Sequence, residues 1–138
     1  EGQEIFENLE KLVEQEKDIR LVINAPDILI NALQRASSVV VQKSIKEGFA
    51  ITVSEALWKG TPVVTSNVGG ISSQVIQGKN GFLLEPKDYA GFAEKIIYLI
   101  KNPDVAEKMG AFGKEYVKNN FLITRHLLDY IQLMKKII

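Results

Sequence analysis

Cysteine is missing from this 138-residue sequence, and histidine occurs once. Without cysteine the chain has no disulfide, no thiolate nucleophile and no cysteine-based zinc site, which fits a reducing compartment. One histidine cannot build a metal site of several histidine ligands. No apolar run reaches the roughly 18 residues that cross a bilayer, and the acidic start does not resemble a signal peptide. We therefore expect a cytoplasmic protein without a membrane span.

Neither sign of charge is in excess, because 17 Lys and Arg residues balance 17 Asp and Glu residues. Without a basic field there is no reason to expect binding to nucleic acid or to an anionic membrane. Any bound phosphate must then be held locally. The glycine-rich phosphate loops of dehydrogenases and of P-loop enzymes are also absent from the sequence. Both of those enzyme classes are therefore excluded.

The composition is that of an ordinary globular domain, with 46% apolar and 25% charged residues. A chain of this length suits one core, so we expect residues 1–138 to form a single domain. Apolar residues recur with a helical period over positions 5–17, and short β-rich runs then alternate with helical stretches. We expect strands at 19–23, 39–41, 62–65 and 82–84, and helices at 28–36, 52–59 and 73–77.

Beyond position 88 the pattern is purely helical. We expect helices at 89–101, at 104–119 with an Asp-x-x-Glu capping signal, and from 123 onward. Strands that alternate with helices form a parallel sheet covered on both faces, so the fold class is α/β and Rossmann-like, with binding sites at the carboxyl ends of the strands. About four strands are fewer than the roughly five or six that such sheets usually have. We expect the first strands to lie before Glu1.

The segment from Ser44 to Ala56 carries the candidate chemistry and reads Ser-Ile-Lys-Glu-Gly-Phe-Ala-Ile-Thr-Val-Ser-Glu-Ala. It follows an expected strand and opens an expected helix, so Glu47 lies in a strand-end loop and Glu55 in the first turns of the helix. Two carboxylates facing one crevice are suited to accept hydrogen bonds from sugar hydroxyls. Free backbone N–H groups at the start of the helix are suited to hold a diphosphate.

Two plainer interpretations stay open for these carboxylates. Thr52-x-x-Glu55 is also a capping box, in which Glu55 only reaches back to a backbone N–H group. Glu47 taken alone is more often a solvated loop charge than a ligand. On these interpretations the chain is a purely structural α/β domain.

The longer pattern resembles the signature of retaining glycosyltransferases with the GT-B fold. Glu47-x7-Glu55 lies within Ser-x-x-Glu-Gly-Phe and is followed by Glu-Ala-x-x-x-Gly-x-Pro-Val-Val. The loop Gly69-Gly70-Ile71 and the turn Gly78-x-x-Gly81-Phe82-Leu83 come next, in the order that this group shows. The group, which is family 4-like, contains sucrose, trehalose and glycogen synthases and many mannosyltransferases. The match runs without a gap from about residue 32 to residue 101.

The resemblance implies a role for each residue of the motif. Glu47 contacts the hydroxyls of the donor sugar and is the candidate catalytic residue, while Glu55 binds the ribose hydroxyls of the nucleotide. Backbone amides after Glu47 face the sugar and the diphosphate. The implied donor-binding set is Ser44, Glu47, Gly48, Phe49, Ala50 and Glu55. Many relatives have glycine where this chain has Ala50. The resemblance implies no metal and no other cofactor, only a nucleotide-sugar substrate such as UDP-glucose or ADP-glucose.

Within this group, three short stretches look most like the glycosyl-transferring trehalose synthases and trehalose phosphorylases. They are Ala-Leu-Gln-Arg-Ala-Ser at 32–37, Glu-Ala-Leu-Trp-Lys-Gly at 55–60, and Gly-Gly-Ile at 69–71. The implied activity is hexosyl transfer from a nucleoside-diphosphate glucose, with retention of anomeric configuration. The implied fold is the C-terminal half of a GT-B enzyme.

The resemblance also implies parts that this sequence does not contain. Family members hold the departing diphosphate with an Arg and a Lys, and neither Lys43 nor Lys46 occupies the pattern of that pair. The acceptor site belongs to an N-terminal domain, against which we expect the terminal helix at 121–138 to pack. We therefore expect the chain to bind a donor but to be inactive alone. A truncated module that only binds nucleotide or a protein partner is the alternative.

Overall fold

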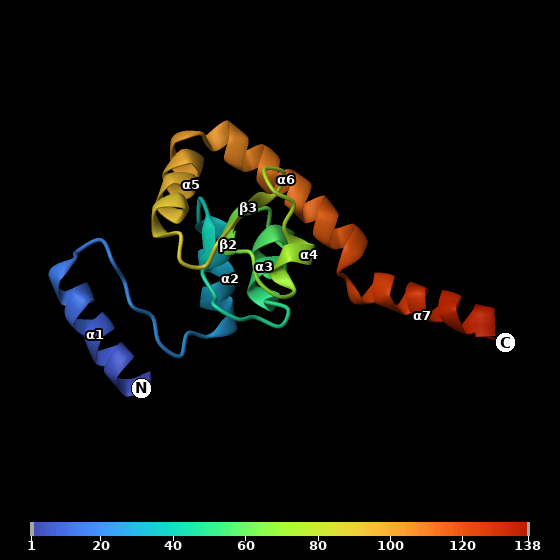
Figure 1. Cartoon of the computed structure of the whole chain (residues 1–138), viewed down its shortest axis with the longest axis horizontal. Coiled ribbons are helices and arrows are strands. Elements are labelled where there is room, and N and C mark those ends of the chain that lie inside the picture. Colours follow the sequence, from blue (N-terminus) through green and yellow to red (C-terminus); the bar gives the residue numbers. More distant parts are fainter. Residues whose placement is uncertain (1, 138) are drawn as a thin grey trace. The chain divides into compact units, whose positions relative to one another are not determined.

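The computed structural model describes residues 2–137, in two compact units, Glu1–Asn31 and Ala32–Ile138. The smaller unit contains helix α1 (Gly2–Gln15) and an irregular segment that leads into α2 (Asp27–Ala36), within which the boundary falls. Both helices were expected from the sequence. The larger unit holds the sheet and all of the motif residues, and it can be followed by colour in Figure 1.

The strand expected at 19–23 is wrong, because this segment has no regular structure. The backbone N–H of Ile19 donates to the carbonyl of Glu16, 3.1 Å away, in a turn that closes α1. A β-rich run becomes a strand only when a neighbouring strand takes up its N–H and C=O groups. In the described part of the chain this segment has no ladder partner, and Val22 and Ile23 remain about half exposed.

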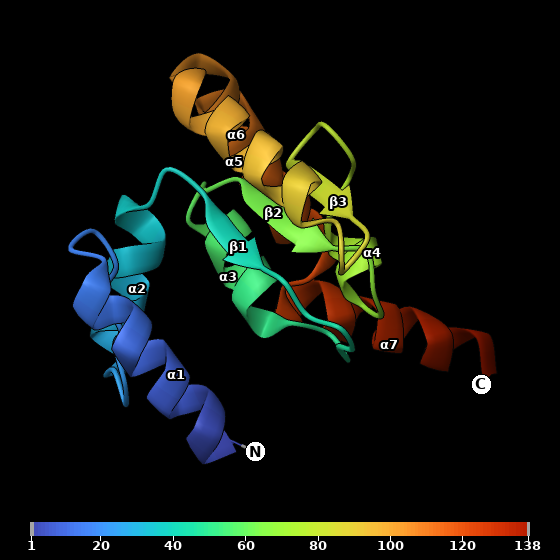
Figure 2. The same ribbon diagram turned by 60° about the vertical axis from the view of Figure 1, so that its left-hand side comes forward.

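The larger unit is built on a sheet of three parallel strands in the order β1-β2-β3. They are β1 (Val40–Gln42), β2 (Val63–Ser66) and β3 (Gly81–Leu84). In the register, Val64 of β2 pairs with Val41 on one side and with Phe82 on the other. Every residue of β2 is buried, as its run of β-branched side chains suggests. Figure 2 shows the three strands running in the same direction.

Helices connect the strands and complete the larger unit. They are α3 (Ile51–Trp58), α4 (Ile71–Gln74), α5 (Tyr89–Lys101), α6 (Pro103–Asn120) and α7 (Ile123–Ile137). Each lies where the sequence predicts a helix, with ends shifted by a few residues. The capping signal predicted for α6 is wrong, because that helix begins at Pro103 and its cap residue Asn102 makes no side-chain capping bond. Proline suits a first helical position because its missing N–H has no partner there.

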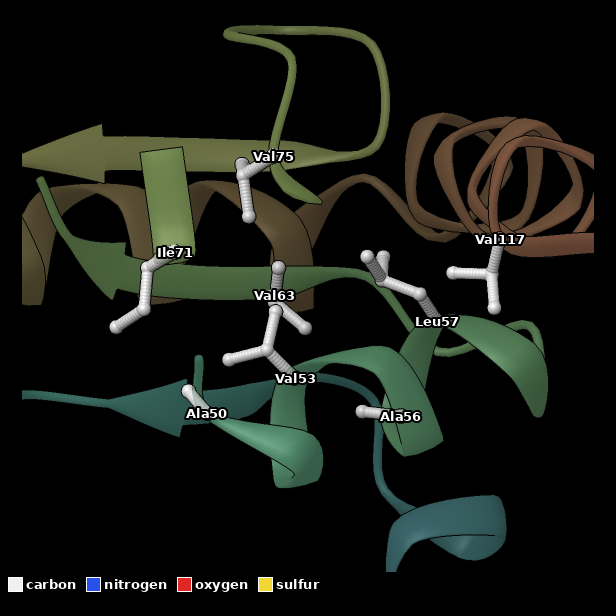
Figure 3. Close-up of a cluster of buried hydrophobic side chains, with 8 residues drawn as sticks. All are labelled: Ala50, Val53, Ala56, Leu57, Val63, Ile71, Val75 and Val117. Carbon is white, nitrogen blue, oxygen red and sulfur yellow. The ribbon is translucent and has the colours of Figure 1, made fainter. Parts of the chain in front are cut away.

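The core has two clusters because successive residues of β2 point to opposite faces of the sheet. Val63 packs with α3, α4 and the far end of α6, as Figure 3 shows for Ala50, Val53, Ala56, Leu57, Ile71, Val75 and Val117. Val64 packs with Phe92 and Leu99 of α5 and with Met109 of α6. Helix α6, which is 18 residues long, contributes Val117 to the first cluster and Met109 to the second, and it thus connects the two helical layers.

The apolar face of the terminal helix is exposed, unlike this core. No described residue of α7 is buried, and its leucines, isoleucines and methionine are each more than two fifths exposed. The helix is amphipathic, with its apolar side chains on one stripe. Within residues 2–137 no helix is both long enough and apolar enough to cross a membrane.

Helix α6 approaches the turn after α3 so closely that a glycine is required at the contact. A Cβ atom placed on Gly110 would lie 1.8 Å from the carbonyl oxygen of Gly60. Helix propensity alone favours alanine over glycine by about 1 kcal/mol. The contact reverses this preference, because the atom that a methyl group would meet belongs to the backbone and cannot rotate away.

We predict that Gly110→Ala lowers the free energy of unfolding by roughly 1–3 kcal/mol, the usual effect of overpacking. Chemical denaturation of the two proteins measures this difference. An increase in stability, which propensity alone predicts, would contradict the close contact.

Candidate functional site

The candidate site lies where two parallel strands end. The motif loop, which we define as residues 43–50, connects β1 to α3, and the loop containing Gly69-Gly70 connects β2 to α4. Because β1 and β2 are parallel and adjacent, both loops leave the same edge of the sheet. The structure therefore brings together two sequence features that are more than twenty positions apart.

Ala50 begins α3 with an unusual backbone conformation. It is the N-cap residue, its φ is 63°, and its carbonyl accepts the N–H of Val53 at 3.0 Å. This left-handed conformation disfavours residues with a Cβ by roughly 1–2 kcal/mol. Ala50 adopts this conformation although it carries a Cβ atom. Among the described residues, none accepts a hydrogen bond from the backbone N–H of Phe49, Ala50 or Ile51.

Glu47 is held by its own loop. Its Oε1 accepts the backbone N–H of Gly48 at 3.0 Å, and its Oε2 lies 3.4 Å from the hydroxyl of Ser44. That hydroxyl in turn accepts the Nε2 of Gln42 at 2.9 Å. The carboxylate is half-buried, so the interpretation of Glu47 as a fully solvated charge does not describe it. A chain of polar groups links the end of β1 to this carboxylate.

The Gly69-Gly70 loop packs directly against the backbone of the motif loop. The N–H of Gly70 donates to the carbonyl of Gly48 at 2.8 Å. A Cβ on Gly70 would lie 2.4 Å from that oxygen, and one on Gly69 would lie 1.8 Å from the carbonyl oxygen of Glu47. Gly69 also has a φ of +50°. Both glycines are thus required by contact, beyond the turn conformations that the sequence suggested.

The side chain of Gln74 holds the motif loop in place, and the sequence analysis did not predict this role. The side chain is fully buried, and its Nε2 donates to the carbonyl of Phe49. Its Oε1 accepts the hydroxyl of Ser54 on α3 at 2.6 Å. One buried amide therefore joins α4, the motif loop and α3. A Gln at the end of a short helix carries no local signal of this role, because both partners are at least 20 positions away.

Glu55 is half-buried on α3 and has a partner from another helix. Its Oε2 accepts the Nε2 of Gln34 on α2 at 3.1 Å. The capping-box interpretation is wrong, because Ala50 is the cap residue and α3 has no side-chain cap. The hydroxyl of Thr52 donates instead to Oε1 of Gln42 at 3.1 Å. Glu47 and Glu55 share no hydrogen-bond partner in the described part of the chain, so each carboxylate is positioned independently.

Aromatic rings contact both ends of the motif loop. The ring of Phe49 lies 5.7 Å from that of Phe121, which packs at 5.7 Å on Tyr116, so the loop is braced by the end of α6. The Nζ of Lys43 lies 4.1 Å from the ring centroid of Tyr89 at the start of α5. This cation–π contact restrains Lys43 at the edge of the sheet. The residues described contain no group of three or more His, Cys, Asp or Glu side chains arranged to hold a metal.

The chain belongs to the family of glycosyl transferases group 1, whose model matches residues 1–116. Its three parallel strands and flanking helices are those of GT-B glycosyltransferases. The sucrose-phosphate synthase of Thermosynechococcus elongatus superimposes with a TM-score of 0.84 at 28% identity, over 95% of this chain and 34% of that one. The resemblance inferred from the motif is therefore confirmed for the family and for the fold.

Trehalose-metabolising relatives are similar over the same residues. The trehalose synthase of Pyrococcus horikoshii is 41% identical over 140 residues, which cover 99% of this chain and 33% of that protein. The trehalose phosphorylase of Grifola frondosa is 37% identical over 93 residues, covering 67% of this chain and 13% of that protein. The resemblance to these enzymes is confirmed. The chain spans about a third of the trehalose synthase that it matches.

We predict that Gly70→Ala lowers the free energy of unfolding by roughly 1–3 kcal/mol and displaces the motif loop. The backbone of Gly70 suits any residue, with a φ of −69°, so only the contact with Gly48 and Phe49 opposes the change. Denaturation and amide chemical shifts of residues 47–50 measure the two effects.

Gly78→Ala is the matched control for this prediction. Gly78 has a φ of +73° but open space around an added Cβ, so the substitution strains only its own turn. It is expected to lower stability while leaving the amide signals of residues 47–50 in place. Unmoved signals in Gly70→Ala would contradict the proposed packing of the two loops.

Proposed function

We propose that this chain is the nucleotide-sugar-binding domain of a retaining glycosyltransferase that transfers glucose from a nucleoside-diphosphate glucose, as in trehalose synthases. The observation that supports it most is the motif loop. There a positioned carboxylate, unpaired backbone N–H groups and a second carboxylate follow one another at the carboxyl edge of β1. A sugar, a diphosphate and a ribose need these groups in the same order.

The donor sugar is assigned to Glu47. A carboxylate accepts hydrogen bonds from two sugar hydroxyls at once, and the bonds from Gly48 and Ser44 leave lone pairs on both oxygens of Glu47. The amides of Phe49, Ala50 and Ile51 lie at the start of α3, where an anion is stabilised. The diphosphate would therefore lie beside the sugar, over the start of the helix.

The ribose is assigned to Glu55, one turn further along α3. The bond from Gln34 occupies Oε2 and leaves the rest of the carboxylate for the two ribose hydroxyls. Since Glu55 stands on the helix and Glu47 in the loop before it, a nucleotide-sugar would run along the first turns of α3. Charge-assisted hydrogen bonds of this kind are stronger than neutral ones, which favours selectivity for the intact nucleotide.

The reaction would need no metal, because the charge developing on the departing diphosphate is offset by the start of α3 and by basic groups outside this chain. Glu47 would act on the sugar as a hydrogen-bond acceptor that orients it. Neither carboxylate is assigned the role of a covalent nucleophile. The chain would supply donor recognition, while the acceptor would bind to another domain.

The terminal helix is the proposed contact with that other domain. Its apolar stripe is exposed along the whole of α7, including Leu127, Ile131 and Met134. An apolar surface of this extent is typical of an interface. The trehalose synthases that match this chain are about three times as long, which is consistent with a further domain in the complete enzyme. A chain that carries only the donor site is expected to be inactive by itself.

Calorimetric titration tests the proposed function. The purified chain is titrated with UDP, ADP and GDP and with their glucose conjugates. Selective binding of one nucleotide and its conjugate is the expected result, and it identifies the base. A folded chain that binds none of the six ligands would overturn donor binding by this chain.

We predict opposite defects for the two carboxylates. Glu47→Ala is expected to weaken binding of the glucose conjugate relative to the free nucleotide by about tenfold or more. This is the effect of losing one hydrogen bond to a charged group. Glu55→Ala is expected to weaken the binding of both ligands by a similar factor and to leave the ratio of their dissociation constants unchanged. The dissociation constants of the two ligands measure this ratio directly.

Glu115→Ala supplies the matched carboxylate control. Glu115 is exposed on α6, where its carboxylate lies 3.7 Å from Lys118 and makes no hydrogen bond to the described residues 43–50, so its removal is expected to leave both dissociation constants unchanged. Equal losses of both ligands in Glu47→Ala and Glu55→Ala would overturn the separate assignment of sugar and ribose.

A further inference from the structure

Gln34 joins a carboxylate to an ammonium group across two helices. Its Nε2 donates to Oε2 of Glu55 at 3.1 Å, and its Oε1 accepts the Nζ of Lys59 at 2.6 Å. Its backbone carbonyl accepts the hydroxyl of Thr61 at 2.7 Å. The residue is 7% exposed. The oxygen and the nitrogen of this buried amide are thus each hydrogen-bonded to a charged side chain, one on α3 and one on the turn that follows.

The orientation of this amide is determined by its partners. A lysine ammonium group only donates hydrogen bonds and a carboxylate only accepts them, so the amide oxygen must face Lys59 and the amide nitrogen must face Glu55. The bond between Thr61 and the backbone at position 34 anchors α2 at the same place. Gln34 therefore has one arrangement available, with its head group between the two charges.

Glu55 and Lys59 are four positions apart, with Glu on the N-terminal side. This is the arrangement that forms a direct ion pair on a helix surface. The structure shows no such pair, since the ion pairs of residues 2–137 involve other side chains. The amide of Gln34 lies between the two charged groups and forms a separate hydrogen bond with each of them. An ammonium group carries a full charge and three donors, so a direct pair with Lys59 would occupy more of the carboxylate than the single bond from Gln34 does.

We infer that Gln34 is a positioning residue that keeps Lys59 off Glu55 and so leaves this carboxylate free to bind the ribose of the nucleotide. The inference rests on the proposed function. Removal of the amide is expected to let Lys59 move onto Glu55 and compete with the ligand. A purely structural role for Gln34 predicts a loss that does not depend on Lys59.

A double-mutant cycle in the 138-residue chain separates these two roles. Gln34→Leu is expected to weaken binding of UDP, ADP or GDP, whichever the wild-type chain binds, by about tenfold. In a Lys59→Gln background the same substitution is expected to weaken it less than about threefold, because no ammonium group remains to occupy Glu55. Equal losses in the two backgrounds would overturn the inference. Gln34→Met replaces Gln34→Leu if circular dichroism shows that the latter is unfolded.

Thr61→Val controls for general loosening of this region. It removes the hydroxyl that contacts the backbone at position 34 and leaves the side chains of Gln34, Glu55 and Lys59 in place. It is expected to lower the melting temperature without changing nucleotide affinity. A loss of affinity in Thr61→Val as large as that in Gln34→Leu would overturn the inference, because anchoring of α2 would then explain both.

The crystal structure of Gln34→Leu gives a readout that does not depend on ligand binding. We expect the Nζ of Lys59 within about 4 Å of a carboxylate oxygen of Glu55, the distance of an ion pair. A Lys59 that points to solvent would overturn the inference. If the wild-type chain binds no nucleotide, the proposed function fails for this chain, while the position of Lys59 still decides whether Gln34 separates the charges.

Discussion

The contact between two loop backbones is the constraint on which the candidate site depends. The carbonyl of Gly48 accepts the N–H of Gly70, and the two chains are so close that neither Gly69 nor Gly70 has room for a Cβ atom. Adjacent parallel strands bring the loops together, and Gln74 then fixes the carbonyl at Phe49. The direction of the free amides at the start of α3 follows from these contacts. The geometry of the site therefore depends on the parallel pairing of β1 with β2.

Buried glutamine side chains stabilise both parts of the candidate site, the motif loop and α3. Gln74 serves the loop that contains Glu47, and Gln34 serves Glu55 on the following helix. An amide carries a donor and an acceptor in a fixed geometry without a net charge, so it can be buried at less expense than an ion once both groups are paired. Each glutamine joins two elements that are distant in sequence. Tertiary structure, and not the local sequence, gives these residues their roles.

The sequence predicted what depends on local pattern. The periodic helices, the three strands of the sheet and the parallel topology were predictable because apolar spacing and β-branched runs record which faces are buried. The strand at 19–23 was not, because composition alone does not provide a partner strand. The capping box predicted at Thr52 is also wrong, because Ala50 and not Thr52 is the N-cap residue. A left-handed residue at Ala50 starts the helix earlier, and a positive φ at a residue other than glycine leaves no mark in a single sequence.

The backbone of Ala50 restricts which amino acids the position can accept in the course of evolution. A φ of 63° is tolerated by glycine, asparagine and aspartate better than by other residues. Ala50 is 8% exposed and packs among Val53 and Ile71, so a polar amide or carboxylate there would be buried without a partner. Branched side chains are excluded by conformation, and polar ones by their surroundings. Glycine and alanine satisfy both conditions, because neither has a branched side chain and neither carries a polar group.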